Sequence, residues 1–174
     1  MSSEYRRGSS STAPPGHEPV HRVPTDSSYY SFNGTPYNDK IADSQTWMYA
    51  REARAQQAGL VSYQQPHNVR YPSRFGNGEK LPFTTPGSYV TPRDQRNGIR
   101  AYLHHPLIPG RSETWAGEQR PGAVRSAYTK GDPNRFDVMY HDPKKGASKS
   151  GHGSMEMANY HAAVPPRPPR APTA

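Results

Sequence analysis

Prolines place the strongest limit on what this chain can fold into. Seven of them fall within 45 residues, at positions 66, 72, 82, 86, 92, 106 and 109. Each proline lacks a backbone N–H and fixes its own φ near −65°, and it also pushes the preceding residue toward an extended conformation. Aromatic side chains and arginines alternate between these prolines. The stretch from Pro66 to Gly110 therefore predicts an extended strap that presents side chains to the surface of another molecule.

The chain has few of the aliphatic residues that usually build a hydrophobic core. Leu, Ile, Val and Phe together make up 19 of the 174 residues, about 11%, whereas chains with less than roughly 20% usually fail to fold alone. Ordering the backbone costs roughly 1–2 kcal/mol per residue, which so few aliphatic side chains do not offset. The 12 Tyr, 2 Trp and 4 Phe are nevertheless too many for a solvated linker. We therefore expect a mostly irregular, extended chain with a few short α-helices and no independent globular core, ordered on a partner.

Segment boundaries follow from turn signals and from changes in composition. Asp43 or Ser44 can cap a helix that ends at Gly59, and Thr91 and Asp94 form a capping-box pattern around Pro92 at the start of another. The expected segments are, in order, a polar arm (1–28), an aromatic segment (29–43), a helix (44–59), an extended strap rich in proline and aromatic residues (60–90), a short helix (91–105), an irregular stretch with short helical turns (106–143), a flexible basic linker (144–153), a short helix (154–163) and a polyproline tail (164–174).

Residue patterns typical of catalysis or of cofactor binding do not occur in the sequence. There is no GxSxG or HExxH motif, and the absence of cysteine excludes disulfides and thiolate metal sites. Gly76-Asn77-Gly78 follows no apolar strand and lacks the lysine of a phosphate-binding loop. His104 and His105 precede a proline, a position that favours a role at a helix end over metal binding. The sequence thus predicts a protein that is not an enzyme, with no catalytic residues, no cofactor and no metal.

The formal net charge of +8 favours a partner with an acidic surface, such as nucleic acid or an acidic protein. No apolar run is long enough for a membrane span, so we expect no membrane partner. Aromatic side chains bury a large area at low entropic cost, and arginines pair with carboxylates. The predicted partner-binding anchors are Tyr29, Tyr30, Phe32, Trp47, Tyr71, Phe75, Phe83, Tyr102 and Trp115, and the predicted basic contacts are Arg70, Arg74, Arg93 and Arg100.

The C-terminal tail, VPPRPPRAPTA, is typical of polyproline II structure. Pro165-x-x-Pro168-x-Arg170 matches the pattern of SH3 ligands, in which prolines fill aromatic grooves and the arginine meets an acidic residue. An SH3-type partner and a simple stiff, basic spacer are both compatible with this tail.

Short stretches rich in Tyr and Pro run through this basic chain, such as YYSFNGTPYND, RYPSRFGNGEKLPF and TWAGEQRPGAVRSAY. In these stretches the chain as a whole resembles the small microtubule inner proteins of ciliary and flagellar doublet microtubules. The resemblance implies a non-catalytic structural protein of the axonemal cytoskeleton that binds tubulin and neighbouring inner proteins. The alternatives are an RNA-threading subunit of a ribonucleoprotein, because several arginines adjoin Tyr or Phe, and an accessory subunit of another large assembly.

Overall fold

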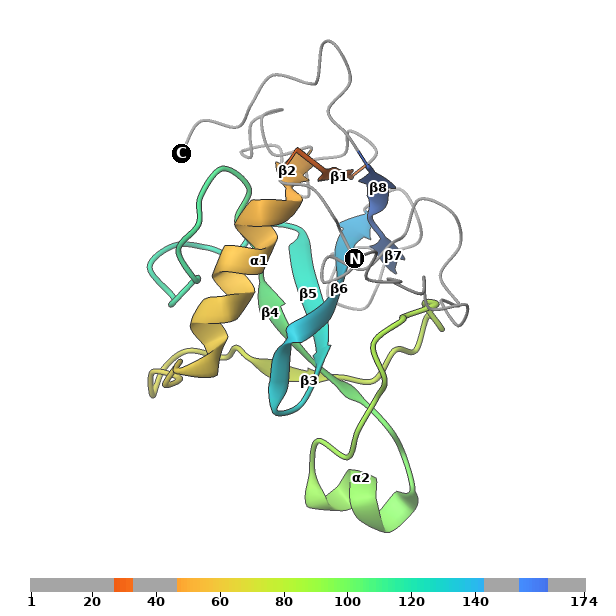
Figure 1. Cartoon of the computed structure of the whole chain (residues 1–174). Helices are drawn as coiled ribbons and strands as arrows, with labels where there is room; N and C mark the ends of the chain where they lie inside the picture. The colour runs from red at the N-terminus through yellow and green to blue at the C-terminus, as the bar shows by residue number, and fades with distance from the viewer. Residues whose placement is uncertain (1–26, 33–46, 143–153, 163–174) are drawn as a thin grey trace, which may run out of the picture.

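Two antiparallel β-sheets and one longer helix form the body of the molecule (Figure 1). The computed structural model describes residues 27–32, 47–142 and 154–162. The larger sheet has five strands in the order β3-β4-β5-β6-β7, namely β3 (Ser73–Phe75), β4 (Tyr102–Pro106), β5 (Val124–Thr129), β6 (Asp132–Asp142) and β7 (Ser154–Met157). The smaller sheet has the order β2-β1-β8, with β1 (Tyr29–Ser31) between β2 (Trp47–Tyr49) and β8 (Asn159–His161).

A tight hairpin between β5 and β6 forms the centre of the larger sheet. Gly131 has a φ of 86° in this turn, a conformation that glycine adopts without steric cost. The register places Ala127 opposite Asp137 and Val124 opposite Tyr140. Both faces of β5 are covered, since every residue from Val124 to Tyr128 is buried. A strand that is buried on both faces shows no alternation of polar and apolar residues.

The helix α1 (Ala50–Ala58) follows β2 without an intervening loop. Tyr49 is its extended N-cap residue, and the Ala50 amide donates to the Ser28 carbonyl at 2.9 Å. The buried face of α1 consists of Ala50, Ala53, Gln56 and Gln57. Small alanines let the helix backbone approach the sheet closely. The single 3₁₀ turn η3 (Gly59–Val61) continues the chain beyond the helix.

The main hydrophobic core lies between α1, the smaller sheet and one face of the larger sheet. Its members are Tyr30, Phe32, Met48, Ala50, Ala53, Leu60, Leu107, Val124, Tyr128, Phe136, Val138, Tyr140 and Ala158. A second cluster, Phe83 with Ala127, Met139, Met155 and Met157, covers the opposite face of the larger sheet. The structure therefore contradicts the expected fold class: the described part of the chain forms a β-structured core of its own. The expectation failed because this core consists largely of Tyr, Trp, Met and Ala, which the aliphatic count omitted.

Several predicted segments are also wrong. The helix expected over 44–59 begins only at Ala50, because residues 47–49 form β2, and the helix expected over 91–105 ends at Asn97. Residues 154–163 were expected to be helical but form β7 and β8, and the irregular stretch 106–143 contains β5 and β6. The aromatic segment is described only at 29–32. Most of the polar arm, the basic linker and the polyproline tail lie outside the described residues.

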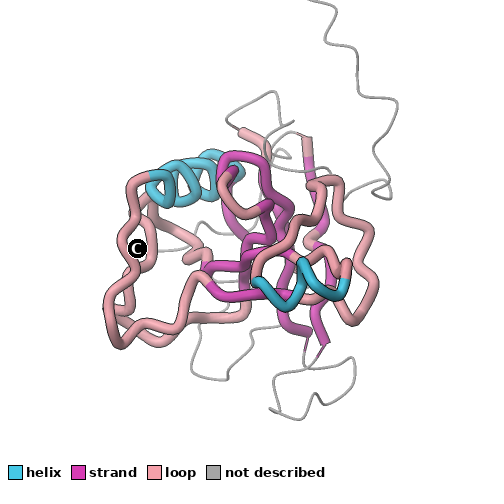
Figure 2. Tube along the Cα trace, turned by 90° about the horizontal axis from the view of Figure 1, so that it is seen from below, coloured by secondary structure: helices cyan, strands magenta, loops and turns pink. Residues whose placement is uncertain are grey.

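A second short helix, α2 (Pro92–Asn97), projects away from both sheets (Figure 1). The view from below shows the strands between α1 and α2 (Figure 2). Here the predicted capping box is confirmed: the Asp94 amide donates to the Thr91 hydroxyl at 3.1 Å, and the Thr91 amide donates to the Asp94 carboxylate at 3.0 Å. The helix ends at Gly98, whose φ of 64° forms the left-handed C-cap.

Candidate functional site

Most of the predicted anchors lie in the chain's own core. Six of the nine are buried, namely Tyr29, Tyr30, Phe32, Trp47, Phe83 and Trp115. The other three, Tyr71, Phe75 and Tyr102, are partly buried and contact other rings of the same chain. The Tyr71 ring, for example, lies 5.1 Å from the His104 ring, edge to face. In this fold the anchors therefore stabilise the chain itself.

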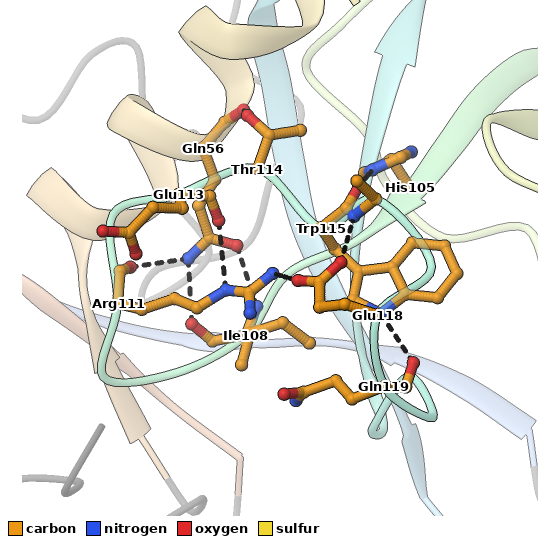
Figure 3. Close-up of polar contacts among 10 residues, drawn as sticks. Gln56, His105, Ile108, Arg111, Glu113, Thr114, Trp115, Glu118 and Gln119 are labelled. Carbon is orange, nitrogen blue, oxygen red and sulfur yellow. Dashed lines mark hydrogen bonds and ion pairs between the residues drawn. The ribbon is translucent and has the colours of Figure 1, made fainter. Parts of the chain in front are cut away.

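Trp115 is a predicted anchor that forms hydrogen bonds within its own loop and to β4 (Figure 3). Its indole Nε1 donates to the Gln119 carbonyl at 2.8 Å, and its own carbonyl accepts from His105 Nε2 at 2.8 Å. Gln56 of α1 binds the same loop through both the amide and the carbonyl of Ile108, at 2.9 and 2.8 Å. An additional ion pair joins Arg111 to Glu118. The loop is thus fixed against α1 and β4 through backbone and side-chain contacts.

Three of the four predicted basic contacts lie on or contact the part of the molecule around α2. Arg70 is exposed on the chain before β3, and Arg74 of β3 forms an ion pair with Asp94. Arg93 and Arg100 are exposed on the projection around α2. We define the α2 lobe as residues 86–101, which connect the loop after β3 to the start of β4.

Several polar contacts hold the α2 lobe in one shape. The guanidinium of Arg74 approaches Asp94 through Nε at 2.9 Å and through Nη2 at 2.7 Å from Oδ1. The same carboxylate caps α2, and the hydrogen bond from Arg74 lowers its pKa to about 2. At the base of the lobe, the amides and carbonyls of Ser88 and Ala101 exchange two hydrogen bonds of 2.9 and 2.8 Å. These contacts give the lobe fixed ends and a fixed helix.

The surface of the α2 lobe is basic and partly apolar. It contains three exposed arginines, Arg93, Arg96 and Arg100, and a single carboxylate, Asp94, which is buried and paired with Arg74. The Tyr89 side chain is 40% exposed and Ile99 is 46% exposed, large values for such side chains. The Arg100 guanidinium carbon lies 5.0 Å from the centre of the Tyr89 ring, within cation–π range.

Arg96, Tyr89 and Ile99 belong to this surface but were absent from the predicted site. The sequence holds a signal for Arg96, because Arg93, Arg96 and Arg100 follow the spacing of one helix face. Since the helix ends at Asn97, only the first two arginines actually lie on it. Tyr89 and Ile99 flank the helix, and only the backbone path of the lobe shows that they lie on the same projection.

One of the serine–histidine pairs in the described chain lies on the larger sheet. Ser73 Oγ and His104 Nε2 lie 2.7 Å apart. Burial, reinforced by the charge of Arg125, lowers the pKa of His104 to about 3, so the imidazole is a weak base at neutral pH. The carboxylate on the same sheet face, Asp137, instead accepts hydrogen bonds from Thr84 and Thr85. This pair therefore lacks the oriented, basic histidine that nucleophilic catalysis requires.

Residues 27–32, 47–142 and 154–162 contain no group of three His, Asp or Glu side chains arranged to hold a metal ion. Within those same ranges no helix has both the length and the hydropathy needed to cross a bilayer.

Comparison of the chain with protein-family models, with curated proteins and with solved structures finds no match.

Proposed function

We propose that this chain is a non-catalytic structural protein that binds acidic protein surfaces through the α2 lobe. One observation supports this most directly. The backbone of the α2 lobe is held in one shape, the lobe exposes three arginines, and its single carboxylate, Asp94, is already paired with Arg74. From the resemblance described above, we propose that the acidic surface belongs to tubulin and neighbouring inner proteins in the doublet microtubules of cilia or flagella.

Arginines on a fixed lobe suit the recognition of carboxylates. A guanidinium group presents its donors in a planar fork that matches a carboxylate, and it is less strongly hydrated than an ammonium group. Tyr89 and Ile99 add an apolar contact area beside the charges. Since the lobe is already ordered, binding does not require the loss of loop entropy that a disordered basic segment would lose.

Co-sedimentation with microtubules at several salt concentrations tests the proposal. The double variant Arg93→Gln/Arg96→Gln removes two charges from the lobe, and Arg120→Gln/Arg135→Gln removes two charges from exposed positions elsewhere. Exposed ion pairs contribute about 0.2–1 kcal/mol each, so the lobe variant should raise the Kd about 2- to 30-fold while the matched control stays near the parent value. Equal effects of the two variants would contradict a specific role of the lobe.

RNA binding is the alternative that the same lobe allows. Arg100 lies over Tyr89, and such a pair can stack on a base while another arginine contacts a phosphate. Replacing microtubules by single-stranded RNA in the same salt series separates the two proposals. If the Arg93/Arg96 variant loses RNA binding with a steep salt dependence and microtubules do not sediment the parent protein, the ribonucleoprotein alternative replaces the microtubule proposal.

A further inference from the structure

Two asparagine–glycine pairs lie in the described part of the chain, and their side chains have different surroundings. Asn77-Gly78 lies in the loop after β3, and Asn97-Gly98 lies at the end of α2. An asparagine before a glycine can lose its side-chain amide spontaneously, because glycine has no Cβ to hinder attack by its backbone nitrogen. Both glycines have open space around them, since a Cβ on either would meet no atom within 4 Å. The hydrogen bonds of each asparagine therefore decide which pair reacts.

The side chain of Asn77 is held by two hydrogen bonds. Its Nδ2 donates to the Leu81 carbonyl at 2.9 Å, and its Oδ1 accepts from the Leu81 amide at 2.7 Å. The residue is also only partly exposed. Any rotation of this side chain toward the backbone nitrogen of Gly78 must first break both bonds.

The side chain of Asn97 is exposed, and no group among the described residues forms a hydrogen bond with it. The following amide, that of Gly98, is shared between the carbonyls of Asp94 and Gln95 and lies 3.3 Å from the latter. This distance is longer than the usual value of about 2.9–3.0 Å. The bond belongs to the last turn of a helix of six residues, and helix ends fray. Asn97 is thus restrained by one weak backbone bond, whereas Asn77 is restrained by two normal side-chain bonds.

We propose that Asn97 is a site of spontaneous deamidation that lowers the charge of the α2 lobe. The backbone nitrogen of Gly98 loses its proton to water and attacks Cγ of Asn97, and the side-chain nitrogen leaves as ammonia. Water then opens the cyclic imide. Cleavage of the new N–Cγ bond gives aspartate, and cleavage of the original peptide bond gives isoaspartate, in which the main chain runs through the former side chain. The net reaction consumes water and releases ammonia, so it needs no oxidant, reductant or enzyme.

A carboxylate at position 97 changes the lobe in two ways. It lies four residues after Arg93, on the same helix face, where it can pair with that guanidinium and offset one of the three exposed arginine charges. Isoaspartate also lengthens the main chain before Gly98, which disturbs the left-handed C-cap and the 2.9 Å bond from the Ile99 amide to the Asp94 carbonyl. Older molecules would then attract an acidic partner less strongly. This consequence rests on the proposed function, whereas the reaction itself does not.

Incubation of the full-length protein at mildly alkaline pH tests the assignment. Chymotrypsin cleaves after Phe75 and Tyr89, so Asn77 and Asn97 fall in separate peptides, and mass spectrometry measures the conversion of each amide to an acid. One additional ordinary hydrogen bond corresponds to a factor of about 2 to 10, so Asn97 should convert about 2- to 10-fold faster than Asn77 in the folded protein. In urea, where both pairs lose their folded surroundings, the two rates should become similar.

Three results would overturn the proposal. They are conversion of Asn77 at least as fast as that of Asn97 in the folded protein, the same ratio of rates in urea as in buffer, and no conversion of Asn97 unless the protein is denatured. Asn97→Gln is the matched control for the reaction, because glutamine would have to form a larger and less favourable ring. It should abolish conversion at this position and leave the rate at Asn77 unchanged.

A second pair of variants separates the reaction from its consequence. Asn97→Asp reproduces one product and should raise the Kd for microtubules about two- to five-fold. Asn134→Asp makes the same change at an exposed position of β6 and should leave the Kd near the parent value. Rapid conversion of Asn97 together with an unchanged Kd of Asn97→Asp would confirm the deamidation site and count against the proposed function of the lobe.

Discussion

Lowering the pH from 7 to 5 is expected to destabilise the fold through two histidines of β4, the partly buried His104 and the buried His105. Burial is the largest cause that lowers the pKa of His104 to about 3 and that of His105 to about 4, from an ordinary value of 6.5. The positive charge of Arg125 adds to the effect at both. Each imidazole Nδ1 is buried without a hydrogen-bond partner in the described structure. A second proton on either ring would therefore be a buried donor with no acceptor.

The sign and size of the effect follow from proton linkage. The folded state binds the proton more weakly than the unfolded state, so acid favours unfolding. The stability contributed by each neutral histidine is complete above pH 6.5 and is lost as the pH falls from 6.5 toward the folded pKa. Integrated from pH 7 to pH 5, the loss is about 2 kcal/mol for each histidine and about 4 kcal/mol for the pair. Single domains have total stabilities of about 5–15 kcal/mol, so this is a large fraction.

Urea unfolding followed by tryptophan fluorescence provides the assay, because Trp47 and Trp115 are both buried. The free energy of unfolding should fall by about 4 kcal/mol between pH 7 and pH 5 in the parent protein and by about half as much in His104→Gln. His67→Gln is the matched control, because that side chain is exposed and should leave the pH dependence unchanged. A parent protein that loses less than about 1 kcal/mol over this range would refute the inference that both imidazoles are held neutral.

Three further substitutions test individual contacts. Thr91→Ala removes the side-chain cap of α2 and should lower the free energy of unfolding by about 1 kcal/mol, measured by urea titration. Asp137→Ala leaves the amides and the hydroxyl that it binds in Thr84 and Thr85 without acceptors, and it should cost about 3 kcal/mol in the same assay. Trp47→Ala empties a fully buried site and should cost about 3–5 kcal/mol of stability in the free protein, a loss that an anchor used only on a partner would not cause.

The parts of the fold that the sequence predicted correctly depend on local chemistry. The capping box of α2 involves residues three apart, and α1 ends at Ala58, just before Gly59, as expected. Gly59 itself has a right-handed helical conformation, with a φ of −64°, and continues into η3. The start of α1 was predicted wrongly because Asp43 and Ser44 offer capping side chains, whereas residues 47–49 pair with β1 as a strand. Pairing partners in this sheet are distant in sequence, so no local pattern indicates them.

The strands of the larger sheet were missed for a second reason. Residues 124–129 show no alternation of polar and apolar side chains, because Arg125 and Ser126 are buried along with their neighbours. The Arg125 guanidinium donates to the carbonyl of Gly122 at 2.6 Å and lies over the Tyr71 ring, so a charged side chain is accommodated in the interior. The sequence therefore shows no strand pattern here, and residues 106–143 were expected to be irregular with short helical turns.

The prediction that the free chain has no core of its own was wrong because it counted only Leu, Ile, Val and Phe as core residues. Nine aromatic and four methionine side chains are buried in the described structure, yet only three of these thirteen residues, Phe32, Phe83 and Phe136, entered the aliphatic and phenylalanine count. Buried aromatic side chains remove about 150–250 Å² each from water and prefer edge-to-face contacts, such as that between Tyr29 and Trp47. A core of this kind needs fewer aliphatic residues, which the threshold based on Leu, Ile, Val and Phe does not consider.

The use of aromatic residues in the core limits how tightly the α2 lobe can bind a partner. Tyr89 and Ile99 are its only large apolar side chains with substantial exposure, and charged contacts at an exposed surface contribute more to association rate and specificity than to affinity. A single lobe would thus bind an acidic surface weakly and reversibly.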